Sequence, residues 1–397
     1  MVNFDFNNKK LFKNKENFSR KKREIVYTKA SFNVKIGKHF SGSSPPEIFV
    51  GRYNYPNINA GILSPNFFEN SEELSMPEIW YEKKFTIGDI LIRRNKLIYG
   101  RFKTDIKRTS RFKSLIQEIA MAYKPVSTEI FLKSPPRQNL EVNRFSPIIT
   151  NLAPLENARL QENPKVDKKV DYIVSDIDSK AVNSINELYK SKIPVSSINK
   201  ILSAGLLGVK TKRKLVPTRW SITAVDDTIS KELLKKIRFY NEIDEILVFN
   251  SEYNGNHYEI ILLPGGFSFE IIEAEINNNK FWHDYEFFHG RKDYASDVVG
   301  GYYVARLALT EYLDRIKRQA TAIFFREVSQ EYYAPVGVGI LRETCRDAFL
   351  KIPEKFNTIQ EAFKIIQDRM KLDISFFMDR SILLNEYGKQ KKISEWF

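Results

Sequence analysis

Several polar side chains lie close together in the segment 215–227, whose other residues are mostly apolar. A polar group in a protein core costs free energy unless it is paired, so these side chains must serve either an internal network or a ligand. An arginine beside hydroxyl groups and a helix N-terminus is a suitable receptor for phosphate. The alternative is an Arg–Asp pair that ties this segment to the next helix. The candidate residues for a phosphate or nucleic-acid site are Thr218, Arg219, Ser221, Asp226 and Asp227.

A second group of charged residues begins in the segment 284–294 and continues along the chain. Arg306 falls between apolar residues of a predicted helix, an unusual position for an arginine without a partner. Ion pairs with Glu327 or Glu343 would explain it, and a phosphate-lined pocket is the alternative. The identity of any cofactor stays open, and a bound nucleotide or phosphate is one option. This group adds the candidates Arg291, Arg306 and Arg326.

The last eight residues contain a glutamine followed by an apolar residue and two aromatic residues at fixed spacing. In one helical turn, the side chains at i, i+3 and i+4 share a face and form an apolar plug, and the glutamine amide can both donate and accept hydrogen bonds. This is the pattern of peptides that bind the PCNA sliding clamp, and a chance match is the alternative. The predicted clamp-binding residues are Gln390, Ile393, Trp396 and Phe397.

The sequence shows no motif for a metal site or for a catalytic nucleophile. The four histidines have no metal-ligand spacing, and nothing requires the acids of the central segments to bind a metal, so we predict none. Cys345 is the only cysteine, which excludes an internal disulfide and a cysteine-type zinc site. No glycine loop of the Walker or dinucleotide-binding type is present. Whether the chain is an enzyme stays open.

The 397 residues carry a net charge of +14, and this excess is concentrated near the N-terminus. Residues 1–40 hold eleven Lys or Arg and three acids, a net charge of +8. Nucleic acid is the leading partner for such a segment, because neutralising phosphates releases counterions; a solvated basic tail is the alternative. Apolar runs are far shorter than the roughly 18 residues that span a bilayer, and no secretory signal is apparent. We expect a cytoplasmic protein without a membrane partner.

The periodicity of apolar residues predicts a mixed α+β fold, with a β-rich centre surrounded by helices and flexible ends. Residues 134–169 read as a long surface connection. A capping box at Ser175–Asp178 predicts a helix start, and Asp226 or Asp227 is placed to cap a helix over Ile229–Tyr240. Gly300 and Gly301 fall inside a predicted helix, which indicates a close backbone contact. The expected strands are Ile48–Val50, Trp220–Val225, Glu245–Phe249, His257–Leu263, Phe267–Ile276 and Thr321–Val328. The expected helices are 111–123, Ala181–Leu188, Ile198–Leu206, Ile229–Tyr240, Ala295–Arg315, Arg342–Leu350 and Ile359–Met370.

Several of these segments together resemble the archaeal Nre family of DNA-repair proteins. The likeness runs from about residue 40 to the end of the chain, and the clamp motif is also a family feature. Some members carry an N-terminal four-cysteine zinc module, which this chain lacks. The segments that carry the resemblance are Ser44–Pro46, Phe49–Arg52, Ser203–Gly208, Leu215–Asp227, Asp284–Leu307, Arg318–Ala320 and Arg326–Glu327.

The resemblance implies a repair role that is linked to replication through the clamp, and it implies no settled reaction. Three hypotheses follow: a clamp-recruited protein that binds DNA or a phosphate-containing ligand, a nucleotide- or phosphoester-processing enzyme addressed to the clamp, and a scaffold for other repair factors. The expected organisation is a basic segment (1–38), an N-terminal family domain (39–280), a C-terminal family domain (281–384) and a clamp-binding tail (385–397).

Overall fold

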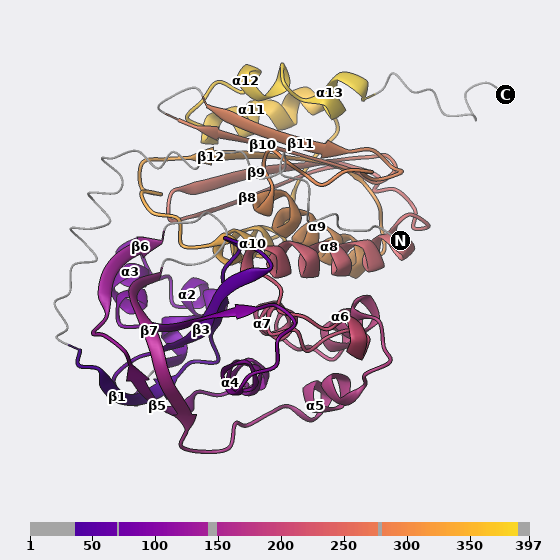
Figure 1. Cartoon of the computed structure of the whole chain (residues 1–397). Coiled ribbons are helices and arrows are strands. Elements are labelled where there is room, and N and C mark those ends of the chain that lie inside the picture. Colours follow the sequence, from indigo (N-terminus) through magenta and orange to yellow (C-terminus); the bar gives the residue numbers. More distant parts are fainter. Residues whose placement is uncertain (1–35, 70, 142–148, 277–279, 388–397) are drawn as a thin grey trace.

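The computed structural model describes residues 36–69, 71–141, 149–276 and 280–387. It contains two β-sheets in separate halves of the molecule, with the long helix α8 (Thr218–Ile237) between them (Figure 1). Helices and strands are mixed in both halves, so the expected α+β class is confirmed. Most of the basic segment (1–38) and the whole predicted clamp motif lie outside the described residues. Within the part that is described, no helix is both long and apolar enough to cross a membrane.

The N-terminal half is built on a seven-stranded sheet in the order β1-β5-β7-β4-β3-β2, with β6 paired to β7. Its strands are β1 (His39–Ser44), β2 (Ile48–Val50), β3 (Asn57–Ser64), β4 (Ile98–Asp105), β5 (Val126–Leu132), β6 (Arg137–Glu141) and β7 (Ile149–Leu160). Its helices are η2 (Ser71–Leu74), α2 (Pro77–Glu82), α3 (Ile87–Asn95), α4 (Arg111–Met121), α5 (Lys168–Ser175), α6 (Ala181–Lys190), α7 (Val195–Ser203) and η3 (Lys210–Lys212). The apolar faces of α4 and α7 close the core of this half.

The C-terminal half is built on a six-stranded sheet in the order β11-β10-β12-β9-β8-β13. The predicted hairpin is confirmed: Asn254 and Gly255 have φ values of 51° and 73° and connect its two strands, as expected for a turn that needs positive φ. The strands are β8 (Ile246–Tyr253), β9 (Asn256–Leu263), β10 (Ser268–Glu275), β11 (Phe281–Glu286), β12 (Thr321–Val328) and β13 (Glu354–Phe356). The helices are α9 (Gly300–Ile316), α10 (Val338–Ala348), α11 (Ile359–Arg369), α12 (Ser375–Met378) and α13 (Ile382–Glu386).

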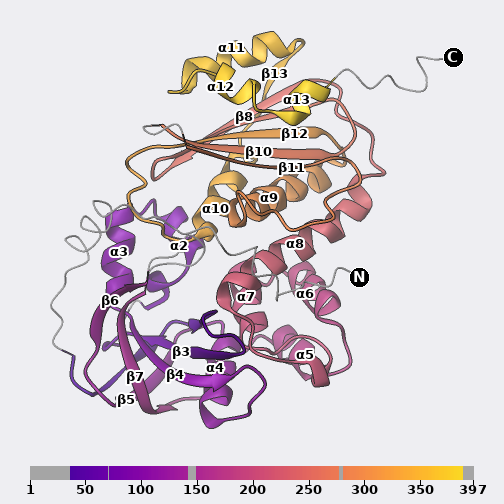
Figure 2. The same ribbon diagram turned by 45° about the horizontal axis from the view of Figure 1, so that its top comes forward.

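Helices cover both faces of the C-terminal sheet (Figures 1 and 2). Alternate residues of each strand point to opposite faces, so Phe324 contributes to the core beneath α9 and α10, whereas Phe325 contributes to the core beneath α11–α13. Helices α8 and α9 pack against each other, which attaches this sheet to the N-terminal half. Strand β11 pairs with β10, so one sheet extends across residue 280, and the domain division proposed there stays a prediction.

The expected strand at Trp220–Val225 is wrong, because these residues lie in the first turns of α8. Their β-branched composition favours a strand, but the hydroxyl groups of this helix bond to its own carbonyls. Ser221 Oγ donates to Thr218 O at 2.9 Å, and Thr223 Oγ1 donates to Trp220 O at 3.2 Å. Buried hydroxyls are therefore satisfied without a strand or a ligand. The helix starts eleven residues earlier than expected, so Asp226 and Asp227 lie within it and do not cap it.

The expected surface connection over 134–169 is also wrong, since it contains β6 and the inner strand β7. Asparagines and a proline interrupt the apolar alternation of β7. Residues 151–154 pair with β4 and residues 155–160 pair with β5, so Pro154 lies where the strand changes partners. A proline is tolerated at such an irregular position.

The expected capping box at Ser175–Asp178 does not start a helix. Ser175 is the last residue of α5, and α6 begins at Ala181 without a side-chain cap. The carboxylate of Asp176 instead accepts from the backbone N–H groups of Asp178 and Ser179, both at 3.1 Å. The same Ser and Asp residues that favour helix starts also form local turns, which explains the error.

The close backbone contact expected at Gly300 and Gly301 is confirmed at the second glycine. A Cβ atom on Gly301 would lie 2.5 Å from Glu273 Oε1 of β10. Only a glycine allows α9 to approach the sheet at this carboxylate.

Candidate functional site

Arg306 lies in the middle of α9 and is almost completely buried. Its guanidinium donates to both carboxylate oxygens of Glu286 at 3.1 Å and to the carboxylate of Asp227 on α8. Burial alone would lower the pKa of Arg306, but the charges of Glu286 and Asp227 raise it well above its ordinary value. The predicted ion-pair explanation for this arginine therefore holds, although its partners are neither Glu327 nor Glu343.

Asp226, the neighbour of Asp227, forms a second buried pair between the two halves. Arg342 of α10 donates to it from Nε at 3.1 Å and from Nη2 at 2.8 Å. This two-point geometry is the strong form of an Arg–carboxylate contact. Burial opposes the charged form of Arg342, yet Asp226 raises its pKa above the ordinary value. The two adjacent aspartates of α8 thus hold α9 and α10.

Two other predicted arginines, Arg291 and Arg326, also have carboxylate partners. Arg291 contacts Asp284 at 3.0 Å, and Arg326 contacts Glu273 at 2.5 Å. Arg219 is half-buried on α8. Burial raises the pKa of Tyr294, whereas a hydrogen bond to Thr223 and the positive charge of Arg219 oppose this rise. The predicted cluster is thus largely a set of ion pairs that connect helices and strands, and Ser221 bonds within its own helix.

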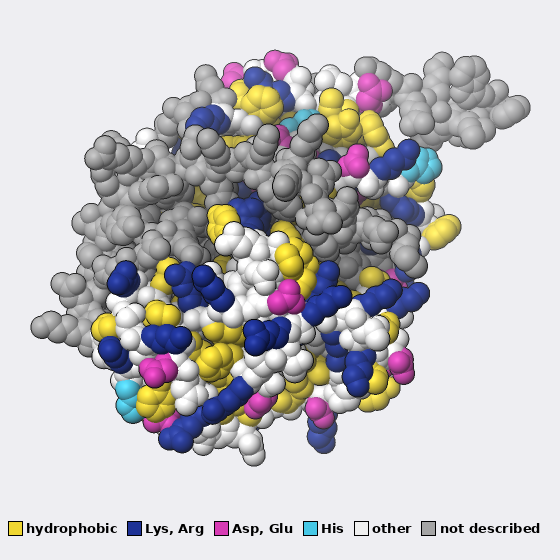
Figure 3. Space-filling model, in the orientation of Figure 1, with side chains coloured by type: hydrophobic (Ala, Val, Ile, Leu, Met, Phe, Trp, Pro, Cys, Tyr) yellow, Lys and Arg dark blue, Asp and Glu magenta, His cyan; other side chains and the backbone are white. Residues whose placement is uncertain are grey.

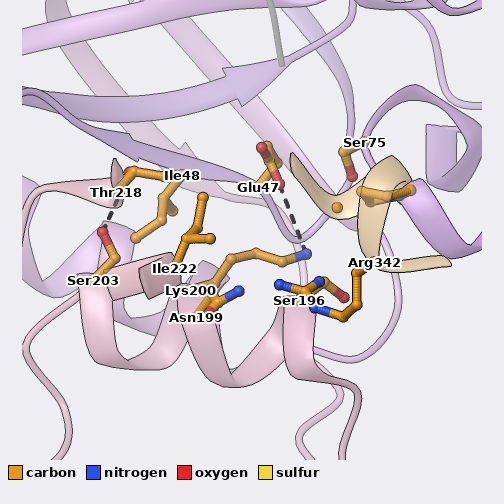
Figure 4. Close-up of a pocket in the computed structure, with 12 residues that line it drawn as sticks. Glu47, Ile48, Ser75, Ser196, Asn199, Lys200, Ser203, Thr218, Ile222 and Arg342 are labelled. Atoms are coloured by element: carbon orange, nitrogen blue, oxygen red, sulfur yellow. Dashed lines mark hydrogen bonds and ion pairs between the residues drawn. The ribbon is translucent and has the colours of Figure 1, made fainter. Parts of the chain in front are cut away.

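Thr218 is the predicted site residue that lines a pocket. Its Oγ1 accepts from the backbone N–H of Val50 at 3.0 Å and lies 3.3 Å from Ser203 Oγ. The pocket, here called the junction pocket, encloses about 60 Å³ where the two halves meet (Figure 4). It is lined by Glu47, Ile48, Ser75, Pro77, Ser196, Asn199, Lys200, Ser203, Thr218, Ile222, Gly339 and Arg342.

Three helices of eight or more residues begin at the junction pocket. Ser196, Thr218 and Gly339 belong to the first turns of α7, α8 and α10, respectively. None of these helices has a side-chain cap at its first turn, because the residues before them are two prolines and a glycine. Uncapped first turns present backbone N–H groups and a partial positive charge, and both favour an anion.

The pocket also gathers buried polar atoms that have no hydrogen-bond partner among the described residues. They are Ser75 Oγ, Ser196 Oγ and Asn199 Oδ1, and the residues Ser75 and Asn199 are only 4% and 7% exposed. A buried polar atom without a partner costs about 1–3 kcal/mol. A polar ligand in the pocket would remove this cost.

Charges of both signs line the pocket: Lys200 and Arg342 are its cations, and Glu47 is its carboxylate. Lys200 and Arg94 approach the carboxylate of Glu47 at 3.7 and 3.8 Å, longer than hydrogen bonds. Arg342 at the opposite side is neutralised by Asp226. The side chain of Lys200 reaches toward the carboxylate of Glu47 across the pocket (Figure 4).

Sequence reasoning missed most of this pocket, including Glu47, Ser75, Asn199 and Lys200. One signal was available: Pro194 and Pro217 each directly precede a helix whose first turn contains hydroxyl residues. Proline at the start of a helix is common, but nothing local shows that two such starts meet in space. Among the described residues, no three His, Cys, Asp or Glu side chains are grouped to hold a metal ion.

Together, the fold and the pocket define an α+β protein in which two sheet-based halves enclose a polar, anion-favouring site. Two family models match the chain: "Archaeal Nre, N-terminal" over residues 22–282 and "Archaeal Nre, C-terminal" over residues 286–396. The chain belongs to the archaeal Nre family.

Curated relatives agree with this assignment. The chain is 35% identical to DNA repair protein NreB of Archaeoglobus fulgidus, over 91% of this chain and 93% of the relative. It is 34% identical to DNA repair protein NreA of Haloferax volcanii, over 87% of each chain, and 34% identical to NreA of Archaeoglobus fulgidus, over 85% and 87%. No solved structure matches the chain.

Proposed function

We propose that the chain is a DNA-repair protein that is recruited to the PCNA sliding clamp by residues 390–397 and that holds a phosphate-containing ligand in the junction pocket. The repair role follows from relatives that are named DNA repair proteins and align over most of their length. The ligand is supported by one observation: three uncapped helix starts meet at buried polar atoms that have no hydrogen-bond partner in the described part of the chain. The clamp partner is supported by the terminal motif.

The last described helix, α13, is attached firmly to the C-terminal sheet next to this motif. The buried carboxylate of Glu270 accepts from the backbone N–H groups of Ile382 at 2.7 Å and Leu383 at 3.3 Å, and from Ser381 Oγ. His283 Nε2 lies 2.6 Å from the same carboxylate. A carboxylate at a helix N-terminus is favoured by the exposed N–H groups and the helix dipole. The tail therefore leaves the folded part at a fixed point.

Clamp recruitment is tested by calorimetry of the full chain with the cognate clamp. The variant W396A/F397A removes the apolar plug and should abolish measurable binding, because aromatic anchors carry much of the energy of short peptide interfaces. The control K391A/K392A changes the two residues between Gln390 and Ile393 and should bind like the wild type. Equal affinity of W396A/F397A and wild type would overturn the proposal.

Ligand binding in the pocket is tested by thermal unfolding with orthophosphate and with a nucleoside monophosphate. A ligand that binds only the folded state raises the melting temperature with concentration. Lys200→Gln should remove the rise, whereas Lys190→Gln, an exposed lysine of α6, should keep it. The absence of any rise in the wild type would overturn the pocket assignment. A rise with the nucleotide alone, followed by its turnover, would favour the phosphoester-processing alternative.

A further inference from the structure

Three segments of the N-terminal half form one continuous surface: 51–57, 101–113 and 209–215. Backbone hydrogen bonds join them in series. Ile106 N donates to Pro56 O at 3.1 Å, and Leu215 N donates to Ile106 O at 3.0 Å. The three segments are distant in the chain, but their backbones are held together, and we call them the basic surface.

The composition of the basic surface is strongly one-sided. Its segments hold eleven Lys or Arg residues and a single acid, Asp105. Six of the cations are exposed, and none of these six forms an ion pair with a carboxylate among the described residues: Lys103, Lys107, Arg108, Arg111, Lys210 and Lys212. On the face shown in Figure 3, Lys and Arg side chains also outnumber those of Asp and Glu over the described N-terminal half. Such an excess repels itself unless an anionic partner neutralises it.

One arginine of the surface has a structural role that holds neighbouring lysines in place. Arg213 donates to the carbonyls of Gly208 at 2.7 Å, Val174 at 2.8 Å and Asp176 at 2.7 Å. These bonds fix the short helix η3, so Lys210 and Lys212 are displayed from an anchored backbone. Lys103 is displayed from β4, opposite Asn59 of β3. Cations on fixed elements lose less freedom on binding than cations on a loose chain.

Aromatic rings lie among these cations. The side chain of Tyr53 is 71% exposed, and the guanidinium of Arg52 lies 5.2 Å from its ring centre. Tyr55 packs on Trp220 with ring centres 5.0 Å apart, and Lys214 Nζ lies 6.0 Å from the Tyr55 ring. Trp220 follows Thr218 of the junction pocket by two residues, so the basic surface reaches the start of α8.

We propose that the basic surface binds single-stranded DNA, with the exposed lysines and arginines on the phosphates and the Tyr53 ring stacked on an unpaired base. Cations alone would suit a duplex equally well, but an exposed ring gains a stacking partner only when bases are unpaired. This inference names the DNA-contacting surface of the proposed repair function and rests on it.

The test uses two full-length variants with the same net charge. K103Q/K107Q/K210Q removes three cations of the basic surface, and K292Q/K364Q/K371Q removes three exposed lysines of the C-terminal half. Binding of a labelled single-stranded 20-mer is measured by fluorescence anisotropy over a range of salt concentrations. The first variant should bind about tenfold more weakly, with a log–log salt slope smaller by about 2, since each phosphate contact on a single strand contributes about 0.7. The second variant should match the wild type.

Equal losses of affinity in both lysine variants would show that affinity follows net charge. No loss in either variant would show that the basic surface is not used. Each of these results overturns the inference.

A second experiment tests the stacking ring. Tyr53→Ala should weaken binding to the single strand and not to a duplex of the same length, and Tyr53→Phe should restore it. Equal loss on both DNA forms would overturn the single-strand assignment. Clamp calorimetry and phosphate-dependent melting of the same variants should be unchanged, so a failure here is separable from a failure of the proposed function.

Discussion

Three arginines of the C-terminal half and three lysines of the N-terminal half differ in how their charges are used. In the C-terminal half, Arg306, Arg326 and Arg342 are almost completely buried, and each contacts a carboxylate. In the N-terminal half, Lys103, Lys107 and Lys210 are exposed and have no carboxylate partner among the described residues. The same formal charge therefore holds elements together where it is buried and paired, and it is available to a partner where it is exposed. Composition alone does not distinguish these two uses, because burial and pairing decide between them.

The strongest test of this contrast removes Arg306. Arg306→Met leaves Glu286 buried without its arginine and leaves Asp227 with Lys231 alone, so we expect the free energy of unfolding to fall by about 3–5 kcal/mol. Urea unfolding followed by circular dichroism measures the change. Lys364→Met, at an exposed lysine of α11, is the control and should change stability little. A loss below about 1 kcal/mol would show that this ion pair does not hold α8 and α9 together.

A smaller loss of stability is expected from removing the hydrogen bond between β2 and α8 at the junction pocket. Thr218→Val removes the hydroxyl that accepts from Val50 N, so the free energy of unfolding should fall by about 1 kcal/mol. Thr218→Ser keeps the hydroxyl and serves as the matched control in the same denaturant series. If the valine and serine variants are equally stable, the link between β2 and α8 does not depend on this hydrogen bond.

The C-terminal sheet should also show a weak pH dependence through His257. Burial lowers the pKa of His257, but the hydrogen bond and charge of Glu259, with the charges of Glu252 and Glu327, raise it above its ordinary value. The stabilisation is present in full below pH about 6.5 and is lost as the pH rises through the raised pKa. The expected loss between pH 6 and 9 is below about 1 kcal/mol. His257→Gln should remove this part of the pH profile, and an unchanged profile would contradict the assignment.

The smallest effect is expected at the basic surface. K103Q/K107Q/K210Q removes only exposed cations that have no carboxylate partner within the described residues, so its free energy of unfolding should stay within about 0.5 kcal/mol of the wild-type value. Differential scanning calorimetry checks this. A loss similar to that of Arg306→Met would mean that these lysines are structural, and the contrast between the halves would then fail.

Some elements were predictable because their signals are local. The hairpin β8–β9 follows from two β-branched runs around an Asn-Gly turn, and strand β12 has the predicted bounds Thr321–Val328. The first half of helix α8 was missed because its buried hydroxyls bond to carbonyls three or four residues earlier, an arrangement that gives no apolar periodicity. Strand β7 was missed because its pairing with three other strands depends on distant residues.

Of the residues that line the junction pocket, the sequence predicted only Thr218. The aspartates of α8 and their arginines are recognisable as charged residues in apolar surroundings, and the structure pairs them. The junction pocket draws Glu47, Ser75, Lys200 and Arg342 from four separate parts of the chain. No spacing rule relates such residues, because their proximity is produced by the packing of helix starts against one another.

The attachment of α13 to Glu270 has a consequence for the geometry of a clamp complex. Helix α13 ends at Glu386, and only three residues separate it from Gln390, the first motif residue. Three fully extended residues span at most about 11 Å. A clamp that binds the motif would therefore hold the folded part of the chain close to the clamp surface. The folded part would then have little freedom to reach distant stretches of DNA.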